Sequence, residues 1–206
     1  MRRSTRRPVD DTEAFRQAVL AEIHAKHPPF GKAVHEDART LARFRGERST
    51  FRSKPDAIFH MARLAWVSDA YFAQVLVRAK TRLIVRGVPV IPRLLHRWAM
   101  ATAQVCVGDP VVLHPGVCFP HGQVVLDGLT EVGSGTVFMP WITVGLQAGN
   151  FQGPTIGRNV TVGHGAKVVG PVRIGDNATI GPNSVVVRDV AAGATVEGLP
   201  ARATTP

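Results

Sequence analysis

Aliphatic residues recur every six positions through the second half of this 206-residue chain. Most are followed by glycine, as in Val162-Gly163, and a second, smaller residue repeats four places after the first. A helix repeats near 3.6 residues and a strand near 2, whereas a six-residue repeat is typical of stacked β-coils. The sequence therefore predicts a β-solenoid with one narrow core. The first repeating set is Val132, Phe138, Val144, Ile156, Val162, Val168, Ile174, Ile180 and Val186. The second set, of smaller residues, is Thr136, Ile142, Val160, Ala166, Val172, Ala178, Ser184 and Val190.

The repeat is disturbed at two places. One extra residue between Phe119 and Leu126 shifts the phase, and this shift lies beside the ionisable side chain of His121. Farther along, Asn150 would occupy an inward position, although a buried unpaired amide is costly. Because glycines and a proline flank it, residues 147–154 are expected to form a loop that leaves the coil. Loops on repeat scaffolds often carry functional residues.

The apolar spacing and the turn residues in the first half of the chain predict helices. We expect one helix from Asp11 or Thr12 to the prolines at 28–29, a short basic one around Leu41 and Phe44, a long one from Ser53 to Gly87, and a last one with Leu94 and Trp98. Most of their apolar residues are expected in the core or in subunit contacts. The fold class is therefore α+β, with a helical domain over residues 1–104 and a β-helix domain with its tail over residues 105–206.

The net charge of +10 belongs to the helical half. Residues 1–100 contain 20 Lys and Arg against 9 Asp and Glu, and residues 101–206 contain 5 against 6. Nucleic acid, an anionic membrane surface or an anionic ligand would each suit such a charge. No aromatic-interleaved basic motif of a nucleic-acid-binding protein accompanies the charge, so a solvated helical surface is the favoured interpretation and no nucleic acid is expected.

Targeting signals are not expected either. The basic segment from Arg2 to Arg7 resembles the start of an export signal, but Pro8-Val9-Asp10-Asp11 follows it instead of an apolar run, which favours a cytoplasmic protein. No stretch has the length and lack of charge of a transmembrane segment. The two cysteines, Cys106 and Cys118, predict no disulfide framework and should lie on different faces of a three-sided coil.

Four short motifs stand out along the chain: Arg-Gly-Val-Pro at 86–89, Pro-Thr-Ile-Gly at 154–157, Val-Gly-His-Gly-Ala-Lys at 162–167 and Gly-Leu-Pro-Ala-Arg at 198–202. Together they resemble the motifs of bacterial serine acetyltransferases. The resemblance covers roughly residues 53–203. It implies a left-handed parallel β-helix, a homotrimer or dimer of trimers, and acetyl-CoA as the acyl donor.

The same resemblance implies a catalytic base. Acyl transfer to a hydroxyl needs a group that takes the hydroxyl proton, and imidazole titrates near neutral pH. Phe119-Pro120-His121-Gly122 occupies the place of the family's Ile-Asp-His-Gly segment, so His121 falls at the family's base position. The alternative is an ordinary surface or core histidine.

Departures from the family concern the acceptor. The family's acidic residue that orients the base falls at Cys106, and its glutamate falls near Gly128, where the adjacent Asp127 could substitute. The Arg-His pair that helps to hold the serine carboxylate is replaced by Gln152 and Gly153. A carboxylate prefers a charged, bidentate partner. The acceptor candidates are therefore Cys106, Asp127 and Gln152, and the loss argues for a sugar or another alcohol over L-serine.

Donor binding is also implied by the resemblance. Small residues along the coil edges would let the pantetheine arm approach the backbone, and nearby cations would meet the CoA phosphates; the alternative for each cation is an ordinary solvated corner. These candidates are Gly145, Leu146, Ala166 and Ser184 for the arm, and Lys167, Arg188 and Arg202 for the phosphates.

A related class of β-helix enzymes binds zinc through three histidines, but His114, His121 and His164 lack its spacing, so no metal is expected. The sequence predicts a CoA-dependent O-acetyltransferase acting on a small-molecule hydroxyl. A catalytically degenerate trimeric scaffold that binds a partner through its basic half stays open. The missing acid at Cys106 favours that alternative, whereas His121 and the closing Gly-Leu-Pro-Ala-Arg motif oppose it.

Overall fold

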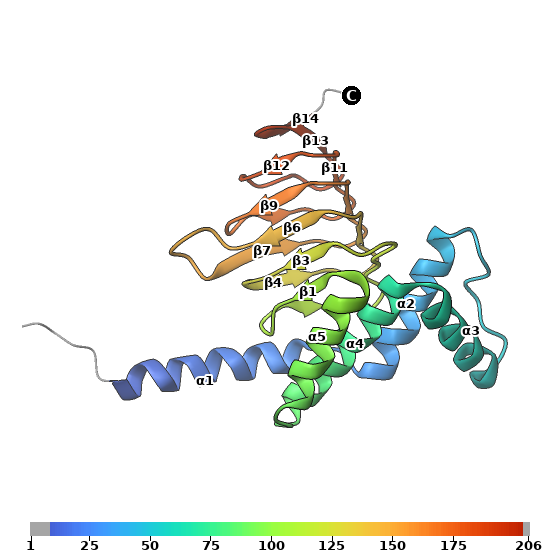
Figure 1. Ribbon diagram of the computed structural model, residues 1–206. Coiled ribbons are helices and arrows are strands. Elements are labelled where there is room, and N and C mark those ends of the chain that lie inside the picture. The colour runs from blue at the N-terminus through green and yellow to red at the C-terminus, as the bar shows by residue number, and fades with distance from the viewer. Residues whose placement is uncertain (1–8, 204–206) are drawn as a thin grey trace, which may run out of the picture.

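Five helices precede a stack of short strands in the computed structural model, which describes the backbone of residues 9–203 and the side chains of residues 18–202 (Figure 1). The basic segment from Arg2 to Arg7 lies outside the described residues. Within the described range, no helix is long and apolar enough to cross a membrane. The helices are α1 (Val9–Lys26), α2 (Phe30–Phe44), α3 (Lys54–Val67), α4 (Asp69–Val85) and α5 (Ile91–Ala103).

The long helix predicted from Ser53 to Gly87 is wrong, because the chain breaks at Ser68 into α3 and α4. Ser68 has extended backbone angles, and its hydroxyl accepts a hydrogen bond from the backbone N–H of Tyr71, which caps the start of α4. Ser53 caps α3 in the same way through the N–H of Asp56. The helix α2, expected to be short, has 15 residues.

Fourteen strands form the stack, and each coil contributes strands to three parallel sheets. The sheets have the orders β1-β3-β6-β9-β12, β2-β4-β7-β10 and β5-β8-β11-β13, with β14 added antiparallel to β13. The strands are β1 (Val105–Val107), β2 (Val112–Leu113), β3 (Val124–Leu126), β4 (Leu129–Val132), β5 (Val137–Phe138), β6 (Ile142–Gly145), β7 (Gln152–Ile156), β8 (Thr161–Val162), β9 (Lys167–Val169), β10 (Arg173–Ile174), β11 (Thr179–Ile180), β12 (Val185–Val186), β13 (Thr195–Gly198) and β14 (Ala201–Ala203).

The register of the sheets confirms the phase shift near His121 and the existence of the loop, but its predicted end at residue 154 is wrong, because residues 152–154 belong to β7. Regular coils pair residues 18 positions apart, as Lys167 does with Val185. Val105 pairs instead with Val124, which is 19 positions away. This longer spacing accommodates the extra residue near His121. Thr143 pairs with Lys167, 24 positions away, because six residues are inserted as a loop between β6 and β7. That loop projects from the side of the stack (Figure 1).

The core of the β-helix consists of the residues that the six-residue repeat predicted. Every residue of both phases is buried, from Val132 to Val190. Cys106 lies in the sheet of β1, whereas Cys118 pairs with Val137 next to the sheet of β5, so the two cysteines are on different faces as expected. The predicted α+β architecture, helices followed by hexapeptide coils, is confirmed.

The helix α4 closes the open end of this stack. The first coil has no strand beneath it, so its outward carbonyls need other partners. Side chains of α4 supply them: Gln74 donates to the carbonyl of Val117 at 2.7 Å, Arg78 to that of His114 at 2.9 Å, and Lys80 to that of Val107. All three side chains are buried, so α4 acts as the cap that a solenoid end requires.

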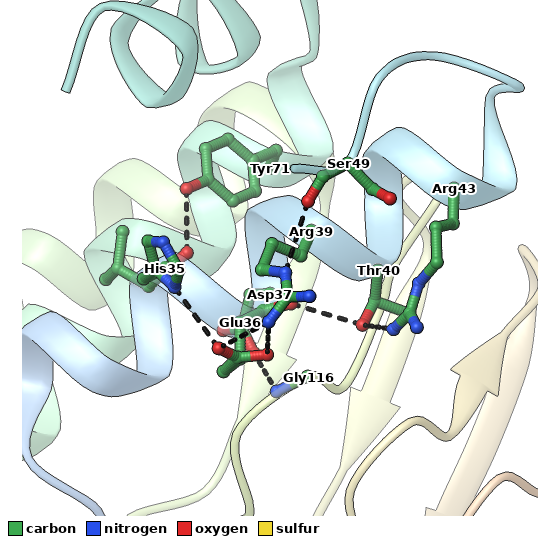
Figure 2. A network of polar contacts seen from close by, with 10 residues as sticks. His35, Glu36, Asp37, Arg39, Thr40, Arg43, Ser49, Tyr71 and Gly116 are labelled. Carbon is green, nitrogen blue, oxygen red and sulfur yellow. Dashed lines mark hydrogen bonds and ion pairs between the residues drawn. The ribbon is translucent and has the colours of Figure 1, made fainter. Parts of the chain in front are cut away.

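The helix α2 joins the same junction through a buried ion pair. Asp37 is 1% exposed and accepts from the guanidinium of Arg78 at 2.9 and 3.0 Å. It also accepts from the backbone N–H of Gly116 at 2.8 Å, a contact between α2 and a coil turn that Figure 2 shows. Burial raises the pKa of Asp37, whereas Arg78 and the Gly116 N–H oppose that rise.

Candidate functional site

His121 lies on the turn that leads into β3, where the helical half meets the first coils. It is exposed and lines a pocket of about 330 Å³, together with residues at the α3–α4 break and at the end of α5. The turn is fixed from below, since the N–H of Gln123 donates to the carbonyl of Ala103 at 2.9 Å. A Cβ at Gly122 would stand 1.8 Å from that carbonyl oxygen, so only glycine permits this approach.

The imidazole of His121 makes no hydrogen bond or ion pair with any residue that the structure describes. Its pocket also contains Asp69 and Arg45, which sequence analysis did not single out. Asp69 could have been found from the serine before it, because Ser-Asp is a common start of a helix. A new helix that begins at Asp69 places this residue in the pocket beside the coil. Neither Asp69 nor Arg45 makes a hydrogen bond or ion pair with the imidazole.

Two of the acceptor candidates, Cys106 and Asp127, lie together in a second cleft of about 670 Å³. It is bounded by α5, the turn before it, and the ends of β1 and β3. Burial raises the pKa of the Cys106 thiol, and the carboxylate of Asp127 adds to the rise. Cys106 is therefore a neutral thiol near pH 7 and does not supply the charge of the carboxylate that the family has there.

The third acceptor candidate, Gln152, is separate from both pockets. It is exposed at the start of β7 and lines a cleft of about 260 Å³ between α1 and the sheet of β4. Its neighbours there include Glu131, which accepts a hydrogen bond from Lys26 at 3.3 Å. Within one chain, the three acceptor candidates and His121 thus occupy three different depressions.

The donor candidates lie on neighbouring coils. Gly145 ends β6 and Leu146 begins the projecting loop, while Lys167 begins β9, the next strand of the same sheet. The ammonium of Lys167 donates to the carbonyls of Trp141 at 2.8 Å and Gly165 at 2.9 Å. Those bonds hold the cation close to a coil corner.

Ala166 and Ser184 stack as predicted, since β9 and β12 pair at an 18-residue register. Both side chains are buried in the core, and the Ser184 hydroxyl accepts from the N–H of Gly198 at 3.1 Å. A ligand could therefore meet only the backbone of these two residues. Arg188 follows β12 and Arg202 lies in β14, and both are exposed.

The other two coil histidines are distributed over the surface. His114 shares a hydrogen bond of 2.9 Å between its Nε2 and Glu131 Oε1, and this bond together with Lys26 keeps the pKa of Glu131 low. His164 is exposed on a coil corner. Over residues 9–203, no three His, Cys, Asp or Glu side chains gather in a way that could hold a metal ion.

Comparison with known proteins relates the chain to one family. Residues 153–188 match the family described as bacterial transferase hexapeptide (six repeats). The serine acetyltransferase of Synechococcus elongatus is 39% identical over 118 residues, which are 55% of this chain and 48% of that protein. The serine acetyltransferase of Helicobacter pylori is 37% identical over 119 residues, which are 56% of this chain and 69% of that protein. The chain spans about half the length of the cyanobacterial relatives that it matches.

Solved structures agree with the observed fold. The serine acetyltransferase of Brucella abortus superposes with a TM-score of 0.70 at 19% identity, covering 91% of this chain and 73% of that one. A Neisseria gonorrhoeae serine acetyltransferase in complex with serine gives a TM-score of 0.60 at 22% identity, covering 90% and 73%. At these identities the likeness concerns the fold alone.

Proposed function

This chain belongs to the serine acetyltransferase family, and from that premise we propose that it is a CoA-dependent O-acetyltransferase acting on a small-molecule hydroxyl. The observation that carries the proposal is the position of His121. The residue at the family's base position lies on an exposed turn, with a free imidazole at a pocket between the helical half and the first coils.

The proposed reaction is a direct transfer. His121 takes the proton of the acceptor hydroxyl as its oxygen attacks the carbonyl carbon of the acetyl thioester. The carbon–sulfur bond then breaks, and the leaving thiolate of CoA receives the proton from the imidazolium. Backbone N–H groups that face the carbonyl oxygen would stabilise the negative charge that develops there.

The acceptor is proposed to be a small alcohol. A solved relative binds serine, and L-serine is the default acceptor of such an enzyme. Gln152 and Gly153 lack a positive charge, so the ion pair with a serine carboxylate would be missing at this place. A sugar or another biosynthetic alcohol is therefore the alternative acceptor.

Acetyl-CoA is the proposed donor, with Gly145, Leu146 and the backbone of Ala166 and Ser184 along the pantetheine arm. Lys167, Arg188 and Arg202 would meet the phosphates. Another solved serine acetyltransferase holds CoA. The proposed reaction needs no metal, since the imidazole moves the proton and the thioester is already activated.

We also propose that the site is completed by a second copy of the chain, in a homotrimer or a dimer of trimers. Two observations support this. The imidazole of His121 lacks an orienting partner among the described residues of its own chain. In addition, α3 exposes Ile58, Phe59 and Trp66, the last 89% exposed, and such apolar faces commonly become subunit contacts. The expected cytoplasmic location stays a prediction.

The test is CoA release from acetyl-CoA, followed with a thiol reagent against L-serine, homoserine and sugar acceptors. With the productive acceptor, His121→Ala should lower kcat by about 10²- to 10⁴-fold, the usual contribution of a general base. His114→Gln is the matched control, because its imidazole is paired with Glu131 away from the pocket. It should leave kcat within about threefold of wild type.

A degenerate scaffold is the second candidate, favoured by the neutral thiol at Cys106 where the family has an acid. In that case no acceptor would support thiol release, and His121→Ala would change nothing measurable. CoA binding without turnover would then move the search to protein partners of the basic helical half.

A further inference from the structure

The cleft that contains Cys106 and Asp127 has the size of a small-molecule site. Its volume of about 670 Å³ lies within the usual range for ligand pockets, roughly 300–1,000 Å³. One wall is α5 and the turn before it, the opposite wall is the ends of β1 and β3, and α4 supplies the floor. Val88, Pro89 and Val125 give the walls apolar patches between the polar groups.

Two free guanidinium groups stand at the rim. Arg93 and Arg97 are four residues apart on α5, so their side chains leave the same face of the helix. Both are exposed and line the cleft, and in the part of the chain that the structure describes neither makes an ion pair or side-chain hydrogen bond. Lys80 also lines the cleft, but its ammonium already donates hydrogen bonds to Asp109 at 2.9 Å and to the Val107 carbonyl.

His96 also lines the cleft, and one of its ring nitrogens lacks a partner among the described residues. Nδ1 of His96 is buried and has no hydrogen bond. Burial lowers the pKa of His96, and Lys80 lowers it further against the smaller effect of Asp109, so the ring is neutral near pH 7. A neutral imidazole can exchange a hydrogen bond with a hydroxyl group. An unpaired buried nitrogen costs free energy unless a ligand or a water satisfies it.

Asp127 provides a further polar contact on the opposite wall. Gly108 makes room for this carboxylate, since a Cβ there would stand 2.5 Å from Asp127 Oδ1. The carboxylate can accept hydrogen bonds from hydroxyl groups but would repel an anion. The cleft is therefore asymmetric, with free positive charge on the α5 side and a hydroxyl acceptor on the coil side.

We propose that this cleft binds the acceptor, and that the acceptor is a phosphate monoester of a small polyol whose phosphate is held by Arg93 and Arg97. Two planar guanidiniums match the charge and the oxygen geometry of a phosphate dianion, whereas a single carboxylate would leave one of them unpaired. The hydroxyl groups lie along His96 and Asp127. This inference rests on the proposed acetyl transfer, and it names the substrate class.

The proposed base is close to this cleft along the chain. Val125 lines the cleft and pairs with Cys106, and His121 precedes Val125 by four residues. The Cα atoms of His121 and Val125 are therefore at most about 14 Å apart. In the proposed complex, one hydroxyl group of the anchored polyol must reach His121 from this cleft, because the imidazole lines a separate depression.

Direct binding to the full chain tests the inference by calorimetry, independently of turnover. The probes are glycerol 3-phosphate, glucose 6-phosphate and N-acetylglucosamine 1-phosphate, each beside its phosphate-free form and L-serine, with and without saturating CoA. At least one phosphate ester should bind in both conditions, and Arg93→Ala/Arg97→Ala should raise its Kd about 30-fold or more. His96→Leu, which keeps both guanidiniums, should raise it about tenfold.

The control is Arg82→Ala/Arg86→Ala, which removes the same charge at the same spacing from the last turn of α4 and its C-cap, outside the cleft. It should change Kd by less than about threefold, the effect of remote exposed charges. Equal weakening by the two double variants, abolition of binding by CoA, or tighter binding of the phosphate-free forms would each overturn the inference. CoA turnover with another acceptor would then leave the proposed function standing, whereas phosphate-ester binding without any CoA binding would refute the function alone.

Discussion

The two halves of the molecule are held together by different kinds of contact. In the β-helix half, each coil repeats its neighbour, with aliphatic side chains inward and backbone hydrogen bonds between parallel strands. The helical half shares apolar core contacts of α4 and α5 with the first coils, and it adds buried polar side chains, chiefly Asp37, Gln74, Arg78 and Lys80, which meet the first coil. Repetition therefore stabilises one half, whereas the junction also depends on buried polar contacts that each occur once.

This contrast predicts how damage spreads. A solenoid shares its stability among equivalent neighbouring coils. A buried charged group has no equivalent, because removing its partner leaves an uncompensated charge in a medium of low dielectric constant. The junction should therefore be more sensitive to a single substitution than the coil core.

The largest effect is expected for Asp37→Ala. It leaves the guanidinium of Arg78, 6% exposed, without its carboxylate, and such a loss costs about 3–5 kcal/mol. Urea unfolding should show the loss as a lower midpoint. Arg158→Ala is the control from the other half, since Arg158 pairs with Asp176 while 72% exposed and should cost less than about 1 kcal/mol. Similar costs for the two variants would remove the contrast between the halves.

A smaller effect is expected for Ile180→Ala in the coil core. The side chain is buried, and its truncation should cost about 2–4 kcal/mol through lost apolar burial and the remaining cavity. Val187→Ala, seven residues on and 48% exposed, should stay within about 0.5 kcal/mol. If both cost the same in urea unfolding, the inward phase does not carry the stability of the coil.

The β-helix half could be predicted from the sequence because its contacts repeat at a fixed spacing along the chain. One residue type repeats at one spacing, so the inward positions follow from counting. Even the exceptions could be counted: the 19-residue pairing of Val105 with Val124 is the phase shift near His121, and the loop before β7 is the place where Asn150 would have been buried.

The helical half could be predicted only in outline. Apolar positions continue from α3 to α4, so periodicity alone does not reveal the break at Ser68, which depends on a side-chain cap. Gln74, Arg78 and Lys80 are polar residues that periodicity assigns to a solvated face. Their burial follows from carbonyls of the first coil, which no local pattern encodes.

The same limit applies to the candidate site. A family motif placed His121, and its role stays a prediction together with those of Cys106, Asp127, Gln152 and the donor residues. The cleft beside α5 combines residues from a helix, a turn and two strands that are distant in sequence. Without the fold, Arg93, His96 and Arg97 are three polar positions of one amphipathic helix.

The smallest expected effect concerns pH and again separates the halves. His27 follows α1 near Arg78 and Lys80, and burial, followed by repulsion from His24 and these cations, lowers its pKa to about 4. The unfolded chain, with a histidine pKa near 6.5, binds this proton more readily. The part of the folding stability that depends on a neutral His27 is therefore fully present above pH 6.5, and it is lost as the pH falls toward 4. Thermal melts from pH 7.5 to 4.5 should show a shallower decline for His27→Gln, with Tm differing from wild type by roughly 2–4 °C at the acidic end. The exposed coil variant His164→Gln should follow the wild-type profile, and parallel profiles for all three proteins would place the acid sensitivity outside this junction.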